Sequence, residues 1–333
     1  MILEQIYGKK NVLMIVVVVI ATIAIYQFLI PVVYSHIPND FSRTKIVLNV
    51  LDKKNKTYKP STVILGNSIV MNCINTKLLA QKINLDTNSV YNLSTTGQNF
   101  NESVLFYPLI KNKATVKHII QFIYLSNFIC QDSIEDSRVD NLLMYGYKKN
   151  DESKYLLQNF YSNEFNQSKF IINWKSRKII SGFINNEFRN ILRKDLNIKS
   201  KESLYFPSVY TKRVPDEAYQ KLIQKFNPTH PITVYQEDSS IINLIKRASS
   251  FCKKNNIEFT LVFSPVNPAL NAYTDTLKQQ IMNRFNQPDL NQIKVINCMN
   301  LVSEPDFIDH VHPNPKVAKS IADEISTKLK SKH

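Results

Sequence analysis

Short apolar runs alternate with segments of helical periodicity along most of the chain after residue 60. The apolar runs predict five strands: Thr62 to Leu65, Ser89 to Leu93, Ile119 to Leu125, Glu258 to Phe263 and Lys294 to Asn297. The periodic segments predict five helices: Asn75 to Lys82, Asn99 to Lys111, Ser239 to Lys254, Asp275 to Phe285 and Lys316 to Lys330. This alternation is typical of a parallel sheet that carries helices on both faces. The pattern therefore predicts an α/β protein.

A long block between the third and fourth predicted strands does not follow this pattern. Residues 130–235 hold aromatic and basic segments, such as FIINWKSRKIISGFINNEFRNILRKDL, that look helical. The chain shows no internal repeat and no Gly/Ser-rich linker that would separate two globular units. We therefore expect residues 61–333 to form one domain, with a largely helical insertion at about residues 130–235.

An uncharged apolar run near the amino terminus predicts a membrane anchor. Residues 12–33 read VLMIVVVVIATIAIYQFLIPVV, which is about the length that crosses the hydrocarbon core of a bilayer. A signal peptide has a shorter apolar core, and a buried core helix seldom has so long an uncharged run. Lys9 and Lys10 precede the run and favour a cytoplasmic amino terminus. The chain is therefore predicted to cross the cell (cytoplasmic) membrane once. Residues 1–11 would be cytoplasmic, 12–34 a transmembrane helix and 35–60 a juxtamembrane segment, and the domain that follows would be extracytoplasmic.

The positive charge of the chain changes the range of expected partners. The formal net charge is +15, and residues 148–225 contribute +8 of it through 16 Lys/Arg and 8 Asp/Glu. These basic residues are scattered among Asn, Ser and aromatic residues, without a zinc-finger, RNA-binding or helix-turn-helix signature. We therefore favour a solvated basic surface and expect no nucleic-acid partner. A positive surface beside a membrane would also attract anionic lipid headgroups or an acidic glycan.

The four cysteines are Cys73, Cys130, Cys252 and Cys298, and none belongs to a CxxC pair. Their spacing does not define a zinc site. We expect buried thiols, with one disulfide of undetermined pairing as the alternative in an extracytoplasmic domain. No metal or cofactor is expected.

Ligands of an open α/β sheet bind beyond the carboxyl ends of its strands, so the residues that follow each strand are the first candidates for a functional site. In VILGNSIV, Gly66 permits a tight turn, and Ser68 begins the next turn or helix, where backbone N–H groups favour a developing negative charge. Gly97 in YNLSTTGQNF and Asn127 in YLSNF follow the second and third strands. Such positions suit the N–H donors that bind an oxyanion in acyl transfer. Each residue alone is more typical of a plain loop or a helix cap, and it is their shared placement that indicates a site.

The segment DFIDHVHPNPKVAKSIADEI near the carboxyl terminus pairs a carboxylate with an imidazole. Asp309 and His312 are separated by two residues, and the final helix follows with Asn314 as its cap. A serine hydroxyl becomes an effective nucleophile when an imidazole takes its proton, and that imidazole needs a carboxylate to orient it. His310 is a competing base, although its contiguity with Asp309 makes their pairing less natural.

Four ordered blocks resemble those of the SGNH (GDSL-like) hydrolase superfamily: GNS at Gly66 to Ser68, YNLSTTGQ with Gly97, YLSNF with Asn127, and DHVH at Asp309 to His312. The resemblance covers about residues 61–128 and 257–330 and implies a flavodoxin-like three-layer α/β/α sandwich. The roles that it implies are nucleophile for Ser68, base for His312, orienting carboxylate for Asp309, and oxyanion hole for Ser68, Gly97 and Asn127. The sequence departs from the family in two places, because Asn67 replaces the usual aspartate of GDS and the third block lacks the GxND form.

An anchor, such a domain and a central insertion are together similar to membrane-bound members that modify cell-surface polymers. Examples are alginate O-acetylation proteins and the protein that assists D-alanylation of teichoic acids. The resemblance implies a serine-dependent acyltransferase or esterase that adds or removes an acyl group, such as acetyl or D-alanyl, on a cell-envelope glycan. Its partners would be an acylated donor, the glycan acceptor and a multi-spanning membrane-bound O-acyltransferase. The alternative is a catalytically degenerate domain that binds glycan or serves as a scaffold of an acylation complex.

Overall fold

A parallel five-stranded sheet forms the centre of the protein. The computed structural model describes residues 11–25, 27–28, 42–128, 142–143, 145–158, 203–208, 210–227 and 239–331. The strands are β1 (Thr62–Leu65), β2 (Val90–Asn92), β3 (His118–Ile123), β4 (Glu258–Phe263) and β5 (Lys294–Asn297). They lie in the order β2-β1-β3-β4-β5, which is the order of doubly wound, flavodoxin-like sheets. The predicted α/β class and parallel sheet are confirmed.

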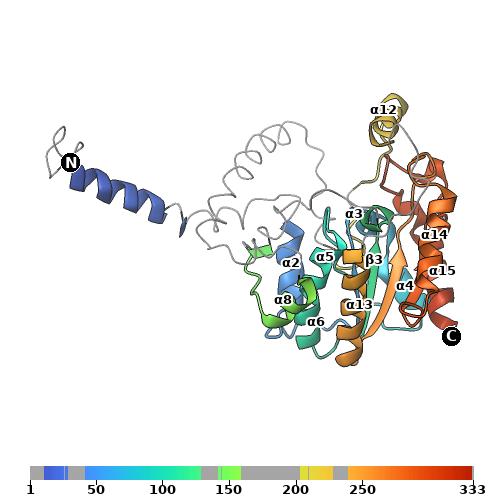
Figure 1. Ribbon diagram of the computed structural model, residues 1–333, viewed down its shortest axis with the longest axis horizontal. Coiled ribbons are helices and arrows are strands. Elements are labelled where there is room, and N and C mark those ends of the chain that lie inside the picture. The colour runs from blue at the N-terminus through green and yellow to red at the C-terminus, as the bar shows by residue number, and fades with distance from the viewer. Residues whose placement is uncertain are drawn as a thin grey trace.

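Helices lie on both sides of this sheet (Figure 1). One side carries α2 (Ser42–Leu51), α5 (Phe100–Ser103), α6 (Tyr107–Asn112), α8 (Asp151–Leu157) and α13 (Ser239–Lys254). The other side carries α3 (Ser68–Cys73), α4 (Thr76–Lys82), α14 (Asp275–Phe285) and α15 (Ala318–Lys330). The remaining elements are α12 (Asp216–Phe226) and the 3-10 turns η1 (Val104–Phe106), η2 (Leu125–Phe128), η3 (Glu304–Asp306) and η4 (Pro315–Val317). This arrangement is consistent with three layers.

Some elements differ from the predicted ones at their ends. The strand predicted to reach Leu125 stops at Ile123, because Leu125 and Phe128 enter the core from the 3-10 turn η2 instead. The helix predicted over residues 99–111 is divided into α5, η1 and α6, and Pro108 stands in the first turn of α6. Proline lacks a backbone N–H and cannot continue an uninterrupted helix.

The segment predicted as juxtamembrane contributes a helix to the core. In α2, Val47, Val50 and Leu51 are buried in the same hydrophobic cluster as the strands. The packed part of the domain therefore extends to the amino-terminal side of residue 61.

Arg43 fastens α2 to the edge of the sheet and to the insertion. Its buried guanidinium donates hydrogen bonds to the backbone oxygens of Ser94 at 2.6 Å, of Ser203 at 2.8 Å and of Asn92. Burial lowers the pKa of Arg43 to about 9. A buried guanidinium with several donors needs such acceptors, because an unpaired charge would be costly in this position.

The described parts of the insertion lie outside the sheet. The backbone oxygen of Leu204 accepts from Asn92 N at 2.7 Å, and that of Tyr205 accepts from Thr76 N at 2.9 Å. These bonds place the segment over residues 203–208 beside the end of β2 and the start of α4. The insertion is thus attached to the edge strand of the sheet.

The cysteines that the structure describes are buried thiols, as expected. Cys73, Cys252 and Cys298 are buried and free, while Cys130 lies outside the described residues. Burial raises the pKa of Cys252 and of Cys298 to about 12. These three thiols therefore stay protonated at neutral pH.

Residues 11–25 form an apolar helix at the amino terminus. Its large side chains from Leu13 to Ile20 are exposed, so they pack against no described part of the domain. No helix in the described ranges is both long and apolar enough to cross a membrane. The predicted anchor also includes Tyr26 and residues 29–34, which lie outside the described residues, and it stays a prediction.

Candidate active site

Loops that are far apart in the sequence lie together at the carboxyl edge of the sheet. Ser68 follows β1, Gly97 follows β2, and Asn127 follows β3 within η2. Because β1 pairs in parallel with both β2 and β3, these three loops leave the sheet at neighbouring positions. Thr95 N donates to the backbone oxygen of Gly66 at 3.1 Å and ties the second loop to the first.

Gly66 and Asn67 shape the turn that presents Ser68. A Cβ on Gly66 would lie 2.6 Å from Val70 Cγ2, so a larger residue would force the turn or α3 to move. Asn67 caps α3, because its side-chain oxygen accepts from the Ile69 N–H at 3.0 Å. The asparagine that departs from the GDS pattern therefore has a defined local role, and Ser68 is the first residue of the helix.

A continuous hydrogen-bonded relay joins three of the predicted residues. His312 Nε2 lies 2.9 Å from Ser68 Oγ, although the two residues are 244 positions apart. His312 Nδ1 lies 2.7 Å from Asp309 Oδ2. The other carboxylate oxygen, Oδ1, accepts from the backbone N–H groups of Val311 and His312, both at 2.8 Å. This geometry fixes the imidazole between the hydroxyl and the carboxylate.

The charge of Asp309 determines the proton positions in this relay. Burial raises its pKa, but hydrogen bonds and charge from His312, together with the Val311 N–H, outweigh burial and lower the pKa to about 2. An ionised carboxylate only accepts hydrogen bonds, so Nδ1 of His312 carries a proton. In neutral His312, Nε2 then presents its lone pair to the hydroxyl of Ser68. The relay is therefore set for transfer of the serine proton to Nε2.

His310 does not face the serine. Its ring stacks on Phe226 of α12, with centroids 4.0 Å apart and planes 5° apart. Its Nδ1 is 3.9 Å from Asp309 Oδ1 and has no hydrogen-bond partner among the described residues. Burial lowers the pKa of His310, although the charge of Asp309 opposes this shift. Of the two histidines in DHVH, the structure places His312 beside Ser68.

The two other predicted oxyanion donors lie in the neighbouring loops. Gly97 has a φ of +64°, a conformation that suits glycine. Asn127 N donates to Tyr124 O at 3.0 Å, and the Asn127 side-chain oxygen accepts from Tyr124 N at 3.4 Å. This bond directs the oxygen of the amide toward its own turn. The roles of Ser68 N–H, Gly97 and Asn127 toward an oxyanion stay a prediction.

Asn72 connects the helix of the serine to the loop of the histidine. Its buried side chain donates to the backbone oxygen of Pro313, directly after His312, at 2.9 Å and to that of Tyr210 at 2.8 Å. The same side chain accepts from Tyr210 N at 3.0 Å and from Ser208 Oγ at 3.1 Å. One amide on α3 thereby holds three segments together.

The insertion contributes to the surroundings of His312. The Tyr210 ring packs on the His312 imidazole, with centroids 4.3 Å apart and planes at 35°. Val214 N donates to the backbone oxygen of Ile308 at 2.9 Å, directly before Asp309. The insertion therefore restricts both the imidazole and the loop that carries it.

A second buried amide, that of Asn267, ties α12 to the same loop. Its nitrogen donates to the Tyr219 hydroxyl of α12 at 2.9 Å and to the backbone oxygen of Asp309 at 3.3 Å. The guanidinium of Arg213 lies over the Tyr219 ring, 4.3 Å from its centroid. The loop of Asp309 is thus held by contacts with the insertion as well as by hydrogen bonds within the loop itself.

Asn72, Tyr210 and Asn267 are site residues that the sequence patterns did not indicate. Asn72 lies one helical turn after Ser68, where a single amide interrupts the apolar run SIVMNC. Asn267 follows β4 at the same carboxyl edge, so the strand-end rule applies to it as well. Tyr210 belongs to the insertion, which carries no pattern that points to the site.

The described part of the chain holds no cluster of metal-ligating side chains beside this geometry. Among the described residues, no group of three or more His, Cys, Asp or Glu side chains is placed to hold a metal ion. No protein-family model and no curated protein matches the chain. The site is therefore defined by its own geometry.

The role of Asn72 predicts a loss of stability on its removal. Asn72→Ala should lower the free energy of unfolding by about 1–3 kcal/mol, because buried donors and acceptors lose their partner. Urea unfolding of the full chain in detergent, followed by circular dichroism, measures this change. Asn88→Ala removes an exposed amide and should change stability by less than about 0.5 kcal/mol. Equal effects of the two substitutions would contradict the role assigned to Asn72.

The relay also predicts an unusual titration of Asp309. Its depressed pKa means that ionised Asp309 stabilises the fold above about pH 4, and this contribution is lost as the pH falls toward about 2. Carbon-13 NMR of the labelled carboxyl should show no protonation above about pH 3 in the folded protein. His312→Ala should raise this pKa, whereas His310→Ala should leave it near the wild-type value. A normal aspartate titration in the wild-type chain would show that the pair does not form.

Proposed function

We propose that Ser68, His312 and Asp309 form a catalytic triad for serine-dependent acyl transfer or ester hydrolysis. The observation that carries this proposal is the relay from Ser68 Oγ through both ring nitrogens of His312 to the Asp309 carboxylate, at 2.9 and 2.7 Å. These lengths lie within the range for a nucleophile, a general base and an orienting carboxylate.

The first half of the reaction forms an acyl-serine. His312 Nε2 takes the Ser68 proton as Oγ bonds to the carbonyl carbon of the donor ester, and Asp309 stabilises the imidazolium. The oxyanion of the tetrahedral intermediate is received by the N–H groups of Ser68 and Gly97 and by the Asn127 side chain. The bond to the leaving oxygen then breaks, and that oxygen takes the proton from His312.

The second half of the reaction returns the serine. Water, or a hydroxyl of an acceptor sugar, loses its proton to His312 and attacks the acyl carbonyl. When the bond to Ser68 Oγ breaks, the imidazolium returns a proton to that oxygen. Water as the attacking group gives an esterase, whereas a sugar hydroxyl gives an acyltransferase.

The wider assignment rests on the resemblance to the SGNH superfamily. The parallel strand order and the strand-end positions of Ser68, Gly97 and Asn127 support a flavodoxin-like three-layer sandwich of this type. By this resemblance the acceptor is a cell-envelope glycan, the acyl group is one such as acetyl or D-alanyl, and a multi-spanning membrane-bound O-acyltransferase supplies the donor.

The apolar helix over residues 11–25 supports an anchored arrangement. Its exposed aliphatic side chains have no described protein surface against them, and such side chains are stable within lipid. Lys9 and Lys10 would then remain on the cytoplasmic side, with the domain outside. In this proposal the enzyme acts at the outer face of the cell membrane.

The triad predicts a defined pattern of lost activity. With p-nitrophenyl acetate as the acyl donor, Ser68→Ala and His312→Ala should each lower kcat by about 10³-fold or more, and the double variant should be little worse, because the two residues act as a unit. Asp309→Asn should keep the fold and lose activity through a misoriented imidazole.

The neighbouring histidine provides the matched control for this series. His310→Phe keeps a ring against Phe226 and should retain most of the activity. Hydrolysis that survives in Ser68→Ala at the wild-type rate would reject the triad and favour a glycan-binding or scaffold role.

The anchor predicts how the full chain partitions. It should sediment with membranes after alkaline carbonate and enter the supernatant only with detergent. Replacing Val17 and Ile20 by lysine should release it, because each charge near the middle of a spanning helix costs about 2.5–3.5 kcal/mol. Replacing the same two residues by leucine should leave it in the pellet. A wild-type chain that is soluble after carbonate would contradict the anchor.

A further inference from the structure

Two adjoining cavities lie away from the proposed triad. The first has a volume of about 890 Å³ between α2, α6 and the segment over residues 145–148, and the second has about 620 Å³. They share Lys53, Lys54, Tyr58 and Asn112 among their lining residues. The second is bordered by the loops that precede β1 and β3, so it opens at the amino edge of the sheet. No triad residue lines either cavity.

Lysines surround the first cavity. Lys45, Lys53, Lys54 and Lys148 belong to its lining, and among the described lining residues the only carboxylate is that of Asp52. Lys53, Lys54 and Lys148 are exposed and form no ion pair with any described residue. The described lining of the second cavity adds Lys56, Lys59 and Lys113 and no carboxylate. A polar ligand that enters here would therefore meet concentrated positive charge.

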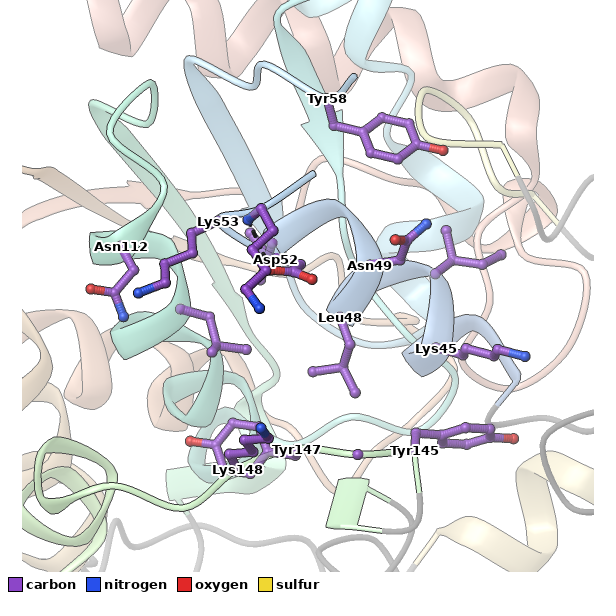
Figure 2. Close-up of a pocket in the computed structure, with 15 residues that line it drawn as sticks. Lys45, Leu48, Asn49, Asp52, Lys53, Tyr58, Asn112, Tyr145, Tyr147 and Lys148 are labelled. Carbon is purple, nitrogen blue, oxygen red and sulfur yellow. Dashed lines mark hydrogen bonds between the residues drawn. The ribbon is translucent and has the colours of Figure 1, made fainter. Parts of the chain in front are cut away.

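The floor of the same cavity is apolar. Figure 2 shows Leu48 pointing from α2 toward the segment that carries Tyr145 and Tyr147. Ile46 and Leu109 are further half-buried apolar lining residues. A soluble phosphate or an acidic sugar would use the lysines but would leave this floor without a partner. An anionic amphiphile has both a charged group for the lysines and an apolar chain for the floor.

The position of the cavity favours a lipid as this amphiphile. α2, which forms one wall, is the first element described after the apolar amino-terminal helix. Tyrosines and lysines are also the side chains that suit the headgroup region of a bilayer. Tyr58 and Tyr145 stand at the cavity together with the lysines, as Figure 2 shows.

We propose that this cavity binds an anionic phospholipid, with its phosphate among Lys53, Lys54 and Lys148 and the first part of an acyl chain against Leu48. This binding site is independent of the triad.

Native mass spectrometry of the full chain in a neutral detergent tests this proposal. Phosphatidylglycerol should be retained at least about tenfold more tightly than phosphatidylcholine with the same acyl chains, and the difference should shrink at high salt. The variant K53Q/K54Q/K148Q should lose this preference. The matched variant K253Q/K254Q/K328Q removes three exposed lysines elsewhere and should keep it.

Two further measurements distinguish this lipid site from the triad and from a site for free phosphate. Ser68→Ala should retain phosphatidylglycerol like the wild type, so failure of the triad and failure of the lipid site are distinguishable. sn-Glycerol 3-phosphate carries the phosphate without acyl chains and should bind at least about tenfold more weakly, because it leaves the apolar floor uncovered. The proposal would be overturned if both phospholipids bound equally or if the two lysine variants lost the preference equally. Equal binding of glycerol phosphate and phosphatidylglycerol would also overturn it.

Discussion

The parallel pairing of β1 with both β2 and β3 is the constraint on which the site depends. All three strands run in the same direction, so the loops after them emerge at one edge of the sheet. Ser68 stands on the central loop, between those of Gly97 and Asn127. His312 reaches the same edge from 244 positions away. The strand order accounts for the meeting of the first three loops, and the bond from Asn72 to Pro313 holds the His312 loop beside Ser68.

Buried polar side chains keep the converging loops in place. Asn72, Asn267 and Arg43 each join segments that are distant in sequence, and each donates to backbone oxygens. Backbone groups of irregular loops must find partners when they leave water, and an amide or guanidinium supplies several donors at fixed directions. The insertion is hydrogen-bonded to all three of these side chains, so it belongs to the architecture of the site.

The sequence was informative where a function depends on local spacing. Asp309 and His312 lie in one short segment, and Ser68 follows a strand that its apolar run identifies, so all three were predictable. The spacing from Asp309 also favoured His312 over His310, and His312 is the one that lies beside Ser68. The contacts of His310 with Phe226 and of His312 with Tyr210 could not be predicted, because both partners belong to the insertion. The burial of α2 likewise arises from packing that hydrophobic periodicity does not encode. The division of the helix ahead of Pro108 follows from the missing N–H of proline, which periodicity alone does not register.

Covalent labelling of the full chain with a serine-directed phosphonate tests the central claim most directly. After reaction, peptide mapping by mass spectrometry identifies the modified residue. Because the proposed triad would activate one hydroxyl, we expect a single phosphonate adduct on Ser68. An adduct confined to another serine, or no adduct on the folded chain, would contradict the triad.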